Sequence, residues 1–241
     1  EHYRRLGFAD EVRALGMPPD FPTDIAYFTR FAGYELARFA LPSARAARQL
    51  VSTLSGSWCA AELPHRCNQK FIEPVLRRHA EALPAVSVHY GCRMTDFRDL
   101  GDHIQVTLDG NHRIKTSYLV GADGPRSAVR QALGIRYVRE TGITRPFVGG
   151  RMYAVYARIL EFYRAVPHRP AWMNVAFNPE RRCFMPAVDG KGEFAFHTQL
   201  QGEEKEDSIS EEQAKAMVQQ AVGMPLRVEV IARAPWTAGH S

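Results

Sequence analysis

The sequence lacks any apolar run long enough to cross a membrane. A transmembrane helix needs about 20 consecutive apolar residues, and no stretch of this chain approaches that length. The N-terminus also lacks the apolar segment of a secretory signal peptide. With 45% hydrophobic and 24% charged residues, the composition is that of a globular protein, so a disordered or low-complexity chain is excluded. We expect neither a membrane span nor secretion.

Cysteine is scarce and widely spaced. The chain has four cysteines, with no C-x-x-C pair among them: Cys59, Cys67, Cys92 and Cys183. This spacing predicts neither a disulfide framework nor a zinc site. His65 lies two residues before Cys67, but no second ligand pair completes a tetrahedral site. We therefore expect reduced thiols, no bound metal and a cytoplasmic protein.

No block of charge of one sign is present. The 31 basic and 26 acidic residues leave a net charge of +5, and the basic residues are spread along the chain in pairs such as Arg77-Arg78. Nucleic-acid-binding proteins usually concentrate such charge on one face. We therefore predict no nucleic-acid partner.

The sequence also lacks the usual signatures of a catalytic site. It contains no recognisable catalytic triad, carboxylate pair or P-loop. Gly190 to Ala195 match G-x-G-x-x-A by letter, but they lead into a strand and not a helix, so we interpret them as a hairpin turn.

Helix and strand signals alternate in the first half of the chain. Asn68 is a suitable N-cap for a helix that contains Pro74, and Asp109-Gly110 is a strong hairpin signal. The predicted elements are a helix over 3–15, strands over 25–31 and 35–41, a Ser- and Pro-rich loop up to 64, a helix over about 69–80, strands over 86–90 and 104–108, and a return strand near 114.

A strand, a Gly/Pro loop and a helix are predicted over residues 118–134. The run from Tyr118 to Ala122 is apolar without alternation, which is typical of a strand buried on both faces. Ser127 is a suitable cap for the helix that follows, and Gly134 a suitable stop.

The loop between this predicted strand and helix is a candidate phosphate site. Gly124 lets the backbone approach a phosphate closely, and the N-terminus of the following helix favours an anion. Asp123 could bind a ribose hydroxyl or a water, and Arg126 and Arg130 suit phosphate. Asp-Gly-Pro is also a common turn, so the residues alone leave both interpretations open.

Beyond Pro146 the pattern is mostly that of an antiparallel sheet. One helix interrupts the strands, with a capping box at Ser210 and Gln213 and a stop at Gly223. Strands are predicted over 152–157, 173–177, 183–188, 194–200 and 227–232. The fold class is therefore α/β plus α+β.

The segment over 118–135 resembles the Asp-Gly motif of the FAD-dependent aromatic hydroxylases, the flavoprotein monooxygenases of the para-hydroxybenzoate hydroxylase type. Residues Leu63 to Gln69 resemble the glutamine segment with which this family contacts its flavin. Further matches lie at 149–153, 171–173 and 234–240, so the resemblance covers nearly the whole chain.

The resemblance implies FAD and NAD(P)H as cofactors. It implies that Gln69 contacts the flavin, and that Asp123-Gly124 serve FAD and NAD(P)H near the pyrophosphate, with Arg126 and Arg130 in the same motif. In the family, NAD(P)H reduces the flavin, oxygen adds to give a flavin hydroperoxide, and the peroxide attacks an electron-rich ring. The expected substrate is a phenolic or polyketide-like aromatic.

The resemblance also implies two interleaved domains. Residues 1–24 and 63–145 are expected to form a partial, Rossmann-like FAD-binding domain, and residues 25–62 and 146–241 a mostly antiparallel substrate-binding domain. Substrate would lie between the flavin and this sheet. Arg151, Trp172, Met185 and His197 are candidate substrate residues, each with an ordinary core or surface role as the alternative. No protein side chain is predicted to be catalytic, because the flavin carries the chemistry.

The sequence resembles only the central part of the family. The G-x-G-x-x-G turn and the later Gly-Asp segment have no counterpart here, so we expect this piece alone to bind FAD weakly or not at all. Two alternatives stay open: a flavin reductase or halogenase of the same fold, and a flavin-free binding module. No lysine stands in a recognisable halogenase context. The sequence leaves a homodimer open.

Overall fold

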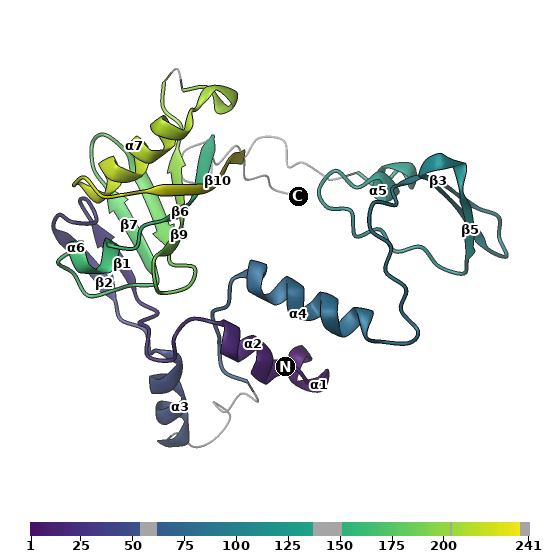
Figure 1. Ribbon diagram of the computed structural model, residues 1–241, viewed down its shortest axis with the longest axis horizontal. Coiled ribbons are helices and arrows are strands. Elements are labelled where there is room, and N and C mark those ends of the chain that lie inside the picture. Colours follow the sequence, from purple (N-terminus) through teal and green to yellow (C-terminus); the bar gives the residue numbers. More distant parts are fainter. Residues whose placement is uncertain (54–61, 137–150, 203, 237–241) are drawn as a thin grey trace. The chain divides into compact units, whose positions relative to one another are not determined.

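The computed structural model describes residues 1–53, 62–136, 151–202 and 204–236 (Figure 1). The chain divides into two compact units, residues 1–77 with 144–239 and residues 78–143 with 240–241. The predicted domains were defined by cofactor-binding and substrate-binding roles, whereas these units are defined by compactness. The predicted domain boundaries therefore stay a prediction. Cys59, Gly149-Gly150 and the last part of the 234–240 match lie outside the described residues.

A seven-stranded sheet organises the first unit. Its strand order is β10-β6-β9-β8-β7-β1-β2, and neighbours are antiparallel except for the parallel pair β1 and β7. The strands are β1 (Ile25–Phe28), β2 (Glu35–Phe39), β6 (Met152–Arg158), β7 (Met173–Phe177), β8 (Arg182–Pro186), β9 (Glu193–Gln199) and β10 (Glu229–Trp236). The predicted hairpin and the five later strands are therefore confirmed, within a few residues at the ends.

One face of this sheet packs against helices and forms the core. In β9, Phe194 and Phe196 are fully buried, whereas Ala195 and His197, which alternate with them, are only half-buried. This period of two places alternate side chains on opposite faces. The buried face contacts α6 (Phe162–Ala165) and α7 (Glu211–Val222), whose core residues are Phe162, Ala214, Met217, Val218, Ala221 and Val222.

The opposite face carries half-buried and exposed side chains, and we call it the open face. The register places one row of side chains across it: Ala234, Ala154, His197, Phe184, Val175, Tyr27 and Ala37. None of these side chains is fully buried. This row runs across all seven strands.

The helix α7 has the predicted boundaries. The Ser210 hydroxyl accepts a hydrogen bond from the Gln213 backbone N–H at 3.1 Å, and the Gln213 side chain accepts one from the Ser210 N–H at 2.7 Å. Gly223 ends the helix with φ +86°. A short 3-10 helix, η3 (Glu206–Ser208), precedes it. The capping box and the glycine stop are confirmed.

The N-terminal helices differ in part from the prediction. The expected helix over 3–15 is two helices, α1 (His2–Arg5) and α2 (Ala9–Leu15), because Gly7 adopts φ +90° between them. The predicted loop after β2 contains α3 (Ala44–Thr53), which begins where the Ser43 hydroxyl accepts a hydrogen bond from the Ala46 N–H at 3.2 Å. The helix predicted from Asn68 is α4 (Gln69–Glu81), with Pro74 inside it.

The second unit holds a three-stranded antiparallel sheet and one short helix. The sheet consists of β3 (Met94–Asp99), β4 (Ile104–Leu108) and β5 (Arg113–Thr116), with the predicted Asp-Gly turn, η1 (Asp109–Asn111), between the last two. The sequence did not predict β3. The helix is α5 (Ala128–Ala132), with Ser127 as its N-cap.

Two predicted strands are wrong. Residues 86–90 and 118–122 form no strand, and Tyr118 and Val120 are each 85% exposed. An apolar strand needs neighbours to pair its backbone and cover its side chains. Within the part of the chain that the structure describes, no strand lies beside either segment.

No helix among the described residues is long and apolar enough to span a membrane.

Candidate functional site

Gln69 is the first residue of α4 and is exposed. Asn68 caps this helix, because its side-chain oxygen accepts a hydrogen bond from the Lys70 N–H at 3.0 Å. The Gln69 side-chain amide donates to the Glu73 carboxylate one turn on. The predicted flavin-contacting residue thus lies at a helix start, with its side chain at the surface.

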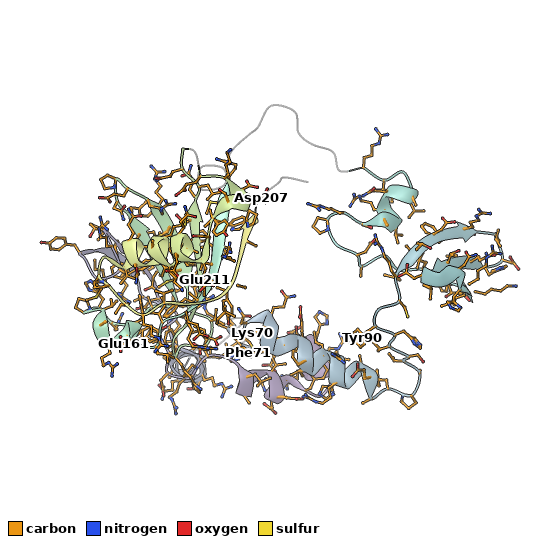
Figure 2. All side chains as sticks on the ribbon, turned by 45° about the horizontal axis from the view of Figure 1, so that its top comes forward. Lys70, Phe71, Tyr90, Glu161, Asp207 and Glu211 are labelled. Atoms are coloured by element: carbon orange, nitrogen blue, oxygen red, sulfur yellow. The ribbon has the colours of Figure 1, made fainter. Side chains whose placement is uncertain are left out.

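An ion-pair network centred on the nearly buried carboxylate of Glu193 fastens the start of α4 to the sheet. Lys70 lies at the start of α4 (Figure 2). Its ammonium contacts the Glu193 carboxylate of β9 and the Tyr156 hydroxyl of β6. Arg158 donates to the other Glu193 oxygen at 3.0 Å. Burial by itself would raise the pKa of Glu193, but the hydrogen bonds from Lys70, Tyr156 and Arg158 outweigh it and lower the pKa to about 2. The network holds the residue next to Gln69 in a fixed place on the sheet.

In the Asp-Gly segment the side chains bind the backbone of α5. The Asp123 carboxylate accepts hydrogen bonds from the Ala128 N–H at 2.6 Å and the Val129 N–H at 3.4 Å. The Ser127 hydroxyl accepts from the Arg130 N–H at 3.0 Å. A hydrogen bond from the Ser127 side chain, with those from the backbone, lowers the pKa of Asp123. The side chains of Asp123 and Ser127 thus bind these three amides at the start of α5.

Two glycines shape this loop in different ways. Gly124 has φ +77° and open space where a Cβ would be, so its backbone conformation is what favours glycine. A Cβ on Gly121 would lie 2.6 Å from the Cβ of Val129, so this position permits the close approach of the loop to α5. Arg130 donates to the Pro125 carbonyl at 2.8 Å.

The loop lines a pocket of about 680 Å³ within the second unit. Leu119 to Asp123 form one wall, and the guanidinium-bearing side chains of Arg93 and Arg126 line it as well. Guanidinium groups suit phosphate oxygens. Arg93 and Arg126 are therefore the groups of this pocket that suit a phosphate, and the carboxylates of Asp109 and Asp123 line it beside them.

Of the predicted substrate residues, His197 lies on the open face. Its Nδ1 accepts a hydrogen bond from the Trp236 indole N–H at 3.0 Å, and its ring stacks on Phe184 at 4.6 Å between centroids. Burial lowers the pKa of His197. Burial and the indole N–H both disfavour protonation of the imidazole, and the hydrogen bond holds the ring in one orientation.

The other three substrate candidates have different places. Met185 is fully buried in the core beneath the sheet, so its predicted contact with substrate has no support here. Trp172 precedes β7, and the Arg66 guanidinium lies 3.4 Å from its ring centroid. Arg151 is exposed, and its carbonyl accepts a hydrogen bond from the Leu200 N–H at 2.8 Å.

The open face also carries aromatic residues that sequence reasoning missed. Tyr27 stacks on Phe177 at 6.1 Å and meets Phe39 edge-on at 5.9 Å. The alternation of residues along each strand indicates which side chains share a face of the sheet. It does not indicate which of the two faces the helices cover, so the sequence alone could not assign these aromatic residues to the open face. Flat aromatic surfaces of this kind suit a planar ring.

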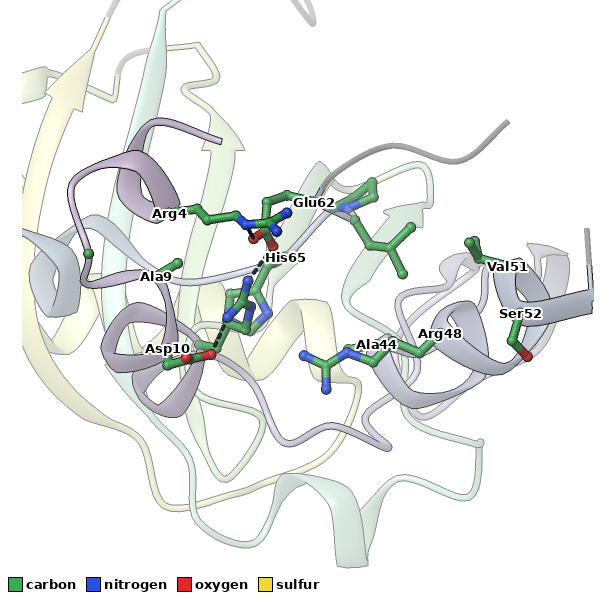
Figure 3. Close-up of a pocket in the computed structure, with 13 residues that line it drawn as sticks. Arg4, Ala9, Asp10, Ala44, Arg48, Val51, Ser52, Glu62 and His65 are labelled. Atoms are coloured by element: carbon green, nitrogen blue, oxygen red, sulfur yellow. Dashed lines mark hydrogen bonds and ion pairs between the residues drawn. The ribbon is translucent and has the colours of Figure 1, made fainter. Parts of the chain in front are cut away.

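Another pocket, of about 640 Å³, lies among α1, α2 and α3 (Figure 3). Arg4, Arg13 and Arg48 line it together with Asp10 and Glu62. Glu62 binds Arg13 and lies 3.9 Å from Arg4, so these charges largely neutralise one another.

His65 also lines this pocket and was considered above as a metal ligand. Burial lowers its pKa, assisted by Arg13 and Arg48. Among the residues that the structure describes, no cluster of three or more histidine, cysteine, aspartate or glutamate side chains could hold a metal ion.

Comparison with known proteins identifies the family. The FAD binding domain family matches residues 1–240 of this chain. The putative polyketide hydroxylase of Streptomyces halstedii is 29% identical over 192 residues, which are 76% of this chain and 32% of that protein. The 3-(3-hydroxy-phenyl)propionate/3-hydroxycinnamic acid hydroxylase of Mycobacterium sp. (strain JLS) is 30% identical over 148 residues, 59% of this chain and 22% of its own length.

Solved structures show the same fold. The flavin-dependent monooxygenase PieE, in complex with FAD and substrate, superposes with a TM-score of 0.82 at 20% identity and covers 98% of this chain and 41% of its own. Aklavinone-11 hydroxylase, with FAD and aklavinone, superposes with a TM-score of 0.77 at 22% identity and covers 98% of this chain and 44% of its own.

The chain thus spans about a third of the length of the first of these relatives and less than half of the solved structures. The match over residues 1–240 nevertheless confirms the resemblance that the Asp-Gly and glutamine segments indicate. This chain belongs to the FAD binding domain family.

Proposed function

We propose that this chain is the part of an FAD-dependent monooxygenase that holds an aromatic substrate, and that the whole protein hydroxylates a phenolic or polyketide-like ring with NAD(P)H as reductant. The observation that carries the proposal is the open face, a sheet surface lined with aromatic side chains, in a chain of the FAD binding domain family. The relatives named as polyketide and phenylpropionate hydroxylases support this substrate class.

The chain's own residues bind and orient. Asp123 and Ser127 hold the loop of the Asp-Gly segment in shape. Arg93 and Arg126, which line the pocket beside it, would bind phosphate oxygens of FAD or NAD(P)H. Gln69 is presented at a helix start that Lys70 fixes to the sheet. When bound, the flavin supplies the redox chemistry with oxygen that no side chain here provides.

On the open face, Tyr27, Phe177, Phe184 and Trp236 offer flat surfaces against which a ring can lie. His197 adds a polar group among them. The protein's contribution to the reaction is then to hold the ring in one plane.

The test uses the protein encoded by the whole reading frame that contains this sequence. We expect a bound-flavin visible spectrum with about one FAD per chain, and NAD(P)H oxidation that a phenolic compound accelerates with incorporation of oxygen into the ring. NAD(P)H oxidation without a hydroxylated product would favour the reductase alternative. A colourless protein that ignores added FAD would contradict the proposal and favour a flavin-free binding module.

A further inference from the structure

The hydrogen bond between Trp236 and His197 fixes which imidazole nitrogen carries the proton. An indole N–H can only donate, and it lies 3.0 Å from His197 Nδ1. Nδ1 must therefore present its lone pair. In a neutral imidazole the proton is then on Nε2.

The same contact opposes protonation of His197. A proton on Nδ1 would face the indole N–H, so that two donors would meet at hydrogen-bond distance. Burial acts in the same direction and lowers the pKa of His197. The side chain stays neutral, as the Nε2–H tautomer.

Within the described residues, the Nε2–H group has no hydrogen-bond partner. His197 makes ring contacts with Phe184, stacked at an interplanar angle of 13°, and with Trp236, edge-on at 87°. Among the residues that the structure describes, no side chain or carbonyl accepts a hydrogen bond from Nε2. His197 lies in the middle of the row across the open face, between Ala154 and Phe184. A donor is thus available in the middle of an apolar surface.

We propose that His197 binds an oxygen of the aromatic substrate through its Nε2–H, with Trp236 as the positioning residue that fixes the tautomer. The partner must be an acceptor, namely a phenolate or a ring carbonyl oxygen. His197 cannot take a proton from a neutral phenol at Nδ1, because the indole occupies that lone pair. This inference rests on the proposed function and adds the oxygen that the site recognises.

The first experiment reads the tautomer and needs no turnover. In the full-length flavoprotein with ¹⁵N-labelled histidine, proton–nitrogen correlation spectra should show His197 as the Nε2–H tautomer. Trp236→Phe, which keeps an aromatic ring without the donor, should produce a mixture of tautomers. A protonated Nδ1 in the wild-type protein would overturn the assignment.

The second experiment measures recognition with 4-nitrophenol, whose anion is coloured. The wild-type flavoprotein should bind the anion more tightly than the neutral phenol, and His197→Phe should weaken anion binding on the order of ten-fold, as expected for one hydrogen bond to a charged acceptor. Trp236→Phe should cause a smaller loss. Nitrobenzene, which lacks the phenolic oxygen, should bind the wild type and His197→Phe alike.

Equal anion binding by the wild type and His197→Phe, or no anion binding by the wild type, would overturn the inference. The proposed function fails by a different result, a colourless protein or NAD(P)H oxidation without hydroxylation. Retained flavin in both variants excludes misfolding as the cause of a lost anion preference.

Discussion

At the scale of single residues, Glu193 is held charged by its neighbours. Lys70, Tyr156 and Arg158 all donate to its carboxylate, and its side chain is 12% exposed. Charge-assisted hydrogen bonds in such a setting contribute more than surface ion pairs. Glu193 therefore matters for stability as well as for the placement of α4.

We predict that Glu193→Gln lowers the free energy of unfolding by about 1.5–3 kcal/mol at pH 7, because charged hydrogen bonds are lost. The folded-state pKa of about 2 lies below the ordinary value of 4.5. The stabilisation is therefore present above about pH 4.5 and is lost as the pH falls towards about 2. Urea unfolding of both proteins between pH 7 and pH 3 should show the difference shrink.

The matched control is Glu161→Gln. Glu161 pairs with Arg164 at 3.3 Å, but the Glu161 side chain is 53% exposed. Its loss should cost less than about 1 kcal/mol. Equal effects of the two substitutions would show that the network around Glu193 contributes no more than a surface pair.

A glycine at the end of α7 gives a second prediction at this scale. Gly223 has φ +86°, and an added Cβ would lie 2.8 Å from Cδ of Arg30. Gly223→Ala should destabilise the protein by about 1–2 kcal/mol from the backbone conformation alone. Any further loss would come from the contact with Arg30, whose guanidinium is held by the Gln220 carbonyl and Glu180. Thermal unfolding would measure it.

Gly7→Ala separates the two causes. Gly7 has φ +90° with nothing within 4 Å of the added Cβ, so only the backbone term applies. A much larger loss for Gly223→Ala than for Gly7→Ala would assign the excess to the contact with Arg30.

At the scale of elements, local signals decided which predictions held. Both ends of α7 were predicted to the residue. Ser210 and Gln213 form a capping box at its N-terminus, and Gly223 ends it in a left-handed conformation. The Asp109-Gly110 turn held for the same reason, since Gly110 adopts φ +71° there. Such signals act within a few residues and need no tertiary context.

Predictions that depended on distant partners failed. The apolar run from Tyr118 predicts a buried strand, but burial requires neighbouring strands, and none lies beside it among the described residues. α3 was missed because Ser and Pro near its ends indicate a loop, and its cap at Ser43 was not recognised. For the site, the sequence indicated His197 but not its bond to Trp236, since 39 residues separate them.

The capping box supplies the prediction at this scale. Ser210→Ala should lower the free energy of unfolding by about 1 kcal/mol, because the Gln213 N–H at the first turn of α7 loses its acceptor. Ser208→Ala is the control: its hydroxyl donates only to the Lys205 carbonyl in an exposed 3-10 turn. Chemical denaturation of both should separate a helix cap from an ordinary surface hydroxyl, and equal losses would contradict the assignment.

At the scale of the whole molecule, the two compact units differ in how much they bury. The core of the first unit extends across the seven-stranded sheet, α6 and α7. Among the described residues 78–136, only Val106 and Ser127 are buried. Since apolar burial is the main source of stability, the second unit should open more readily than the first.

Amide hydrogen exchange of this 241-residue chain tests the difference. The central strands β6 and β9 should exchange only through global unfolding, because both are flanked on each side by other strands and one of their faces lies in the core. Strands β3, β4 and β5 should exchange faster, through local opening, even though their backbone amides are paired. Equal protection of both sheets would show that burial within each unit does not set its stability. The comparison of β4 with β9 is the sharpest, since each is flanked by two antiparallel partners and the two strands differ chiefly in how much apolar surface they bury.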